Sequence, residues 1–171
     1  MTIVNESDDN RGLGTYFFSY GIHPWQASLR EENFLTFEEK ITNKKYDYSD
    51  TKEAVAFRVI ADHIRAIAFT IADGQLPANT GAGYVIRRIL RRAVRYYYSY
   101  LDYKHPLLHQ LMPSLAKQFE NVFPELTGQL EFVTKVVKEE EEGFLRTLEK
   151  GLKRMDDIIS THPKMRPLKE N

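Results

Sequence analysis

Cysteine is absent from the 171 residues, so the chain can hold neither a disulfide nor a thiolate metal site. Long hydrophobic runs are also missing, because no stretch of eighteen apolar residues occurs and the N-terminus lacks the charged and apolar segments of a signal peptide. These absences predict a soluble, cytoplasmic protein with no membrane partner.

Net charge is missing too, since 24 basic residues balance 24 acidic ones. The balance hides a local excess, because residues 84–104 hold five arginines and Lys104 against Asp102 alone. Arg87, Arg88, Arg91, Arg92 and Arg95 lie at three- and four-residue steps, where like charges on a helix repel. An anionic partner would relieve this repulsion, and two remain open: nucleic-acid phosphates, or the acidic residues of the C-terminal helix.

Apolar periodicity predicts a mainly α fold, an antiparallel bundle of three to five helices with a long C-terminal helix across it. The spacing predicts a first helix over 51–72 that ends at Asp73-Gly74, with a capping box from Asp50 to Glu53. It predicts a second helix over 83–102. The expected buried stripe of that helix consists of Val85, Ile86, Ile89, Leu90, Ala93 and Val94.

The C-terminal third predicts a helix interrupted or restarted at Pro113, then one long helix from Pro124 to about Ser160. Its seam, close to a heptad pattern, could serve the bundle or self-association through 126–159. Glu139–Glu142 are expected on a solvated face or as partners of the arginines. The seam consists of Leu126, Leu130, Val133, Val137, Phe144, Leu148, Met155 and Ile159.

The N-terminal part has another character. Residues 1–36 contain four glycine or proline breaks and a strand-like TYFFSYGI, and FLTFEEKI could form one or two helical turns. FSYGIHPWQA faintly resembles a segment of TatD-like metal-dependent hydrolases, but His23 has no further ligands around it. We therefore expect an appendage over 1–40, a helical domain over 41–160 and a polar tail over 161–171.

Two features leave alternatives open between structure and binding. Asp62, His63 and Arg65 interrupt the apolar helix, either as local pairs or as groups that support the basic helix or touch RNA. The loop GQLPANTGAG before the basic helix is either a plain turn or a site for a phosphate or a base edge.

A family resemblance favours the binding alternative for both features. ADHIR, ADG, P-x-N and GYVIRRILRRAVR, in this order, resemble the tRNA-recognition region of alanine–tRNA ligases over about Ile41–Ser160. The resemblance implies recognition of the acceptor stem of alanine tRNA, where this family reads a G·U pair from the minor groove. It implies tRNA-binding roles for Asn79, Arg65 and four arginines of the basic helix, with Asp62, His63 and Arg95 in support. Those four arginines are Arg87, Arg88, Arg91 and Arg92.

The same resemblance implies that ATP and Mg²⁺ act in an upstream catalytic core, so this chain should bind tRNA without alanylating it. No catalytic residue and no metal ligand is assigned. Thr80-Gly81-Ala82 depart from the more polar residues of other members and offer fewer contacts from the loop. A helical protein-interaction module with a basic face, an inactive fragment of a truncated or rearranged reading frame, and a hydrolase remnant are the alternatives.

Overall fold

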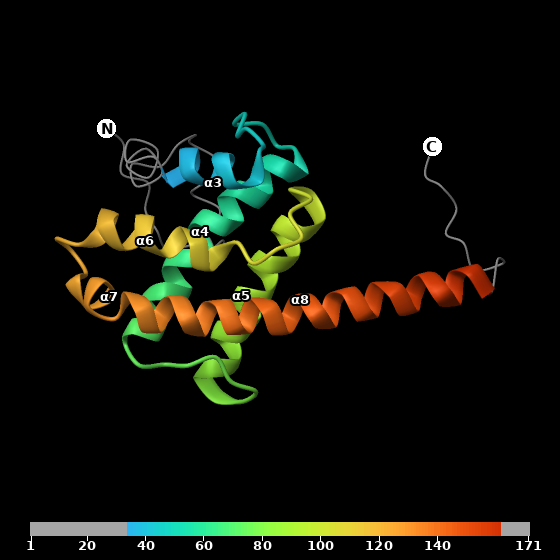
Figure 1. Ribbon diagram of the computed structural model, residues 1–171. Coiled ribbons are helices and arrows are strands. Elements are labelled where there is room, and N and C mark those ends of the chain that lie inside the picture. The colour runs from blue at the N-terminus through green and yellow to red at the C-terminus, as the bar shows by residue number, and fades with distance from the viewer. Residues whose placement is uncertain (1–33, 162–171) are drawn as a thin grey trace, which may run out of the picture.

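The computed structural model describes residues 34–161, which form helices and connecting loops with no strand in that range (Figure 1). The mainly α bundle with a long C-terminal helix is thereby confirmed. Its elements are α3 (Phe34–Thr42), α4 (Lys52–Ala72), α5 (Gly81–Tyr100), α6 (Leu108–Phe119), α7 (Pro124–Gly128) and α8 (Leu130–Thr161).

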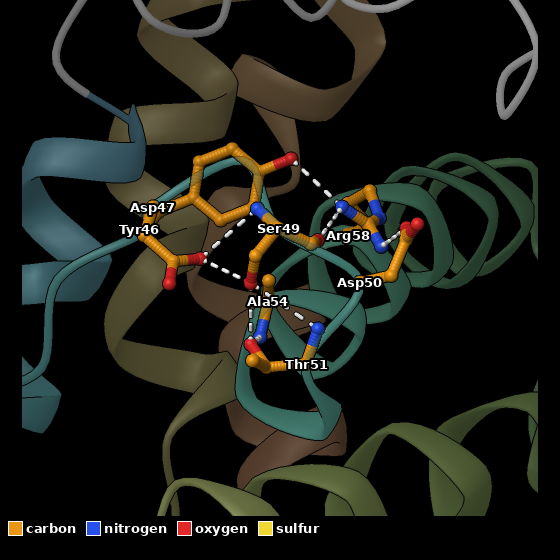
Figure 2. A network of polar contacts seen from close by, with 7 residues as sticks. All are labelled: Tyr46, Asp47, Ser49, Asp50, Thr51, Ala54 and Arg58. Atoms are coloured by element: carbon orange, nitrogen blue, oxygen red, sulfur yellow. Dashed lines mark hydrogen bonds and ion pairs between the residues drawn. The ribbon is translucent and has the colours of Figure 1, made fainter.

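The start of α4 is fixed by a polar network (Figure 2). Thr51 is the N-cap, and its hydroxyl accepts a hydrogen bond from the Ala54 N–H at 3.3 Å. The predicted capping box on Asp50 is wrong, because the Asp50 carboxylate lies 3.5 Å from the Arg58 guanidinium instead. Arg58 also donates to the Ser49 carbonyl at 2.9 Å, so the connection between α3 and α4 is held against the side of α4.

The core lies between α4 and α5 and is closed by α6 and the first half of α8. α4 buries the predicted apolar residues from Ile60 to Ile71, while Val55 and Val59 are only half-buried. It ends at the C-cap Asp73, after which Gly74 has φ +88°. α5 buries a stripe that differs from the predicted one, since Val85 is 55% exposed and Tyr97 is fully buried. The stripe consists of Gly83, Ile86, Leu90, Ala93, Val94 and Tyr97.

The predicted interruption at Pro113 is wrong, because α6 runs from Leu108 to Phe119 with Pro113 inside it, on its exposed side. Its N-terminus is satisfied by a side chain from another helix. The fully buried Glu141 carboxylate of α8 accepts from the backbone N–H groups of Leu107, Leu108 and His109 at 2.8–3.0 Å. The Tyr97 hydroxyl of α5 donates to the same carboxylate at 3.0 Å. Glu141 therefore joins α5, α6 and α8.

The predicted single helix from Pro124 to Ser160 is divided at Gln129 into α7 and α8, so residues 34–161 alone hold six helices where three to five were expected. Gly128 weakens the helix at this point, and the Gln129 side chain donates to the Ala72 carbonyl at 2.8 Å. Beyond Leu145, α8 projects from the bundle with Leu152, Met155 and Ile158 exposed (Figure 1). The predicted seam is thus buried against the core only in its first half.

Several predictions fall on residues outside the described range. They concern the appendage before Phe34, the strand-like TYFFSYGI with His23, and the polar tail after Thr161. The domain boundaries at residues 40 and 160 stay predictions, although α3 shows that regular structure is present from Phe34. Within the described residues, no helix is both long and apolar enough to span a membrane.

Candidate nucleic-acid interface

Four arginines lie along the solvent side of α5, opposite its buried stripe. Arg88, Arg91, Arg92 and Arg95 are exposed, because offsets of three and four residues keep them on neighbouring positions of the outward face. Among residues 34–161 the structure records no ion pair for any of the four. Within the described part of the chain, the outward side of α5 therefore carries four cations that form no ion pair.

These four side chains line a groove of about 760 Å³ on the surface. α4 contributes His63 to one part of it and α8 contributes Phe144 to another. The groove thus combines guanidinium groups with an apolar and aromatic lining, which suits an anionic ligand that also has faces to stack. The remaining lining residues are Val85, Ile89 and Tyr96.

Aromatic rings lie against three of the guanidinium groups. Arg91 lies 5.3 Å from the centre of the Phe144 ring, which reaches across from α8. Arg88 lies 5.7 Å from the Tyr84 ring, and Arg92 lies 5.7 Å from the Tyr96 ring. Cation–π attraction of this kind restricts where a guanidinium can sit without neutralising its charge. The rings therefore hold the cations in place for an incoming anion.

Arg87 is directed differently from its neighbours. Its Nε donates to Glu140 Oε2 at 3.0 Å, its Nη2 contacts Glu140 Oε1, and its Nη1 donates to Asn79 Oδ1 at 2.6 Å. The side chain is only 18% exposed. The alternative that the arginines pair with the acidic helix therefore describes Arg87, whereas the other four keep the outward orientation.

The loop over residues 73–80 passes very close to the first turn of α5. A Cβ added to Gly83 would lie 2.3 Å from the Leu76 carbonyl oxygen and 2.7 Å from the Ala78 side chain, so only glycine fits. The Ala78 N–H donates to the Gly83 carbonyl at 3.0 Å. This approach fixes the backbone of the loop just before the exposed Asn79.

The three polar residues that interrupt the apolar face of α4 are joined by polar contacts. Asp62 Oδ2 lies 3.2 Å from His63 Nδ1, and Asp62 Oδ1 lies 3.8 Å from the Arg65 guanidinium. The hydrogen bond from His63, with the charges of His63 and Arg65, lowers the pKa of Asp62 below its ordinary 3.8. Of this group only His63 lines the groove, and Asp62 contacts this lining residue.

Sequence reasoning missed the burial of Glu141 and the position of Phe144 beside Arg91. The spacing of Glu141 could have indicated its burial, because the buried residues of α8 recur every four positions. They are Val133, Val137, Glu141 and Leu145. The expectation of a solvated or arginine-paired acidic run holds for Glu140, which binds Arg87, and is wrong for Glu141.

The fold and the groove define a basic helical module. Residues 25–171 match the profile of the family described as tRNA synthetases class II (A), so the chain belongs to the class II tRNA synthetase family. It is similar to the alanine–tRNA ligases of that family, with 57% identity to that of Cytophaga hutchinsonii over 124 residues. The alignment covers 72% of this chain and 14% of the relative.

Other alanine–tRNA ligases give the same result. The enzyme of Flavobacterium psychrophilum is 51% identical over 129 residues, covering 71% of this chain and 14% of the relative. The enzyme of Bacteroides fragilis is 59% identical over 106 residues, covering 62% of this chain and 12% of the relative. The resemblance seen in the motifs is confirmed, and the chain spans a small part of the length of the curated relatives it matches.

Proposed function

We propose that this chain is the tRNA-recognition region of an alanine–tRNA ligase and that it binds the acceptor stem of alanine tRNA. The observation that carries the proposal is the groove beside α5, where four exposed arginines have no acidic partner among the described residues. Arginine binds phosphate through two parallel N–H groups, so a row of such side chains matches a nucleic-acid backbone. Membership of the tRNA synthetase family supports RNA as the anion.

The proposed roles follow from position. Arg88, Arg91 and Arg92 hold phosphate and sugar groups, and Arg95 extends the same face at the far end of the groove. Asn79 is exposed on the loop just before α5, which begins at Gly81, and lies 8 positions before Arg87; it contacts a base edge. An A-form RNA helix presents base edges in a wide, shallow minor groove, which a short side chain on a loop can reach.

The remaining predicted residues support this surface. His63 lines the groove, while Asp62 holds both His63 and Arg65 along the edge formed by α4. Arg87 belongs to the site through its bond to Asn79. We further propose a cytoplasmic location, and we retain self-association through 126–159 as a prediction. ATP-dependent alanylation is proposed for the full-length enzyme only, and no residue here is assigned to ATP or Mg²⁺.

A protein partner is the second candidate. The Arg87–Glu140 pair shows that a guanidinium group of α5 binds a carboxylate, so an acidic protein surface could take the place of phosphates. The two candidates differ in what they predict for RNA. A protein-binding face would show no preference between two acceptor stems. Its affinity for RNA would not depend on which positions of α5 carry the arginines.

The test is a titration of this chain with an alanine-tRNA acceptor-stem hairpin, beside the same hairpin carrying G·C in place of G·U. We expect tighter binding of the G·U hairpin. The logarithm of the association constant should fall linearly with the logarithm of salt concentration, with a slope of about −0.9 for each phosphate neutralised on a duplex.

A double variant, Arg88→Ala/Arg91→Ala, should reduce the magnitude of this slope by roughly 2, since two phosphate contacts are removed. The matched control is Lys153→Ala/Arg154→Ala, which removes the same charge from the exposed, projecting end of α8. The proposal is wrong if the chain does not bind the hairpin at low salt, or if both double variants weaken binding equally.

A further inference from the structure

The Arg87 side chain joins three separate segments through one guanidinium group. It donates twice to Glu140 of α8, once to the Asn79 amide oxygen, and once to the Pro77 carbonyl at 3.3 Å. Because every guanidinium N–H is a donor, the Asn79 atom facing it must be the oxygen. The amide NH₂ of Asn79 is therefore the end left for a ligand.

The loop backbone alone does not fix this orientation. The close approach at Gly83 and the bond from Ala78 to Gly83 hold the backbone next to Asn79, but the Asn79 side chain is exposed and otherwise free to rotate. Its contact with Arg87 at 2.6 Å is the hydrogen bond that the structure gives the amide group. The orientation of Asn79 thus depends on where Arg87 lies.

Arg87 in turn depends on Glu140. Four more arginines follow Arg87 on the same helix, and all four are exposed. Arg87 is turned away from that face and is held by two contacts to a carboxylate that is itself only 20% exposed. Removing the negative charge would free Arg87 to turn outward with the other arginines, and Asn79 would lose its donor.

We propose that Glu140 is a positioning residue of the RNA site, which fixes the Asn79 amide through Arg87 and thereby sets the preference for one acceptor stem over another. Glu140 touches no RNA in this arrangement, because its carboxylate faces Arg87 and lies on α8. The inference rests on the proposed function, but its structural part, the ordering of Asn79 by Glu140, stands without RNA.

The experiment uses the full chain in three variants. Glu140→Gln keeps the side-chain size and removes the charge. Arg87→Lys keeps the charge, but one ammonium group cannot reproduce the fork that reaches Glu140, Asn79 and Pro77 together. Glu139→Gln is the matched control, since it removes the same charge from the exposed neighbouring position.

The first readout is the Asn79 side-chain amide in NMR spectra without RNA. In the unmodified chain and in Glu139→Gln we expect the two Asn79 amide proton resonances to lie away from their random-coil positions, with the relaxation of an ordered group. Glu140→Gln and Arg87→Lys should both shift them toward the random-coil positions, with the relaxation of a mobile side chain. Unchanged resonances in both variants would overturn the proposal.

The second readout is the ratio of affinities for the G·U and G·C hairpins. Glu140→Gln and Arg87→Lys should lower this ratio by roughly tenfold, equal to about 1.4 kcal/mol. A merely structural role would weaken both hairpins alike. Failure of the unmodified chain to bind either hairpin would contradict the proposed function, and the amide resonances would still decide whether Glu140 orders Asn79.

Discussion

Replacing the buried Glu141 by glutamine tests whether one carboxylate joins α5, α6 and α8. Oε1 accepts from Tyr97, Leu107 and Leu108, and Oε2 accepts from the His109 N–H. Glutamine keeps one oxygen, which in its best orientation faces the first three donors. Its NH₂ group then faces the His109 N–H, donor against donor.

The cost can be worked from these contacts. A largely buried N–H left without an acceptor costs about 1–3 kcal/mol, and three bonds that lose their charged acceptor weaken by about 1 kcal/mol each. With some relaxation we expect Glu141→Gln to lower the free energy of unfolding by about 3–5 kcal/mol, against a typical total of about 5–15 kcal/mol. For a chain of this size that corresponds to a fall in Tm of roughly 10 °C.

Urea unfolding followed by far-UV circular dichroism at 222 nm measures this change. The control is Glu139→Gln, an exposed position where the expected change is within about 0.5 kcal/mol. The reasoning would be refuted by equal unfolding midpoints for the two variants, because the buried carboxylate would then contribute no more than a solvated one.

Two further predictions concern the loop and the edge of the groove. Gly83→Ala should destabilise the chain by about 1–3 kcal/mol, because the new Cβ meets the Leu76 carbonyl oxygen. The control is Gly151→Ala, which should be neutral or stabilising because its Cβ meets nothing within 4 Å. Thermal unfolding of both variants measures the difference. The lowered pKa of Asp62, caused mainly by its bond from His63, means that this group stabilises the fold above pH 3.8 and that its contribution is lost as the pH falls below that value. Asp62→Asn should therefore flatten the acid limb of a plot of urea midpoint against pH, and an unchanged limb would show that the pair contributes nothing.

The helices and the basic face were predictable because both follow from local spacing. α4 repeats apolar residues at three- and four-residue steps, and the same rule placed four of the five arginines on one face of α5. Gly74 ended α4 as expected, since its φ of +88° favours glycine.

The rest depended on contacts between distant segments. Nothing in the sequence distinguishes Arg87 from its neighbours, because its orientation is set by Glu140, 53 positions away. The acidic run that includes Glu141 is expected on a solvated face or as partners of the arginines, although the four-residue spacing of Glu141 with Val137 and Leu145 marks the buried face. The break at Gln129 likewise depends on a tertiary bond to the end of α4.

The most direct test of the central claim is to map where the acceptor-stem hairpin binds. Backbone amide chemical shifts of the full chain would be followed by NMR during titration with the G·U hairpin. The account predicts that the largest changes fall on Asn79, on α5 between Arg88 and Arg95, and beside Phe144, with the α8 residues 150–161 unaffected. Changes concentrated on the projecting part of α8, or on α6, with α5 unaffected, would contradict it.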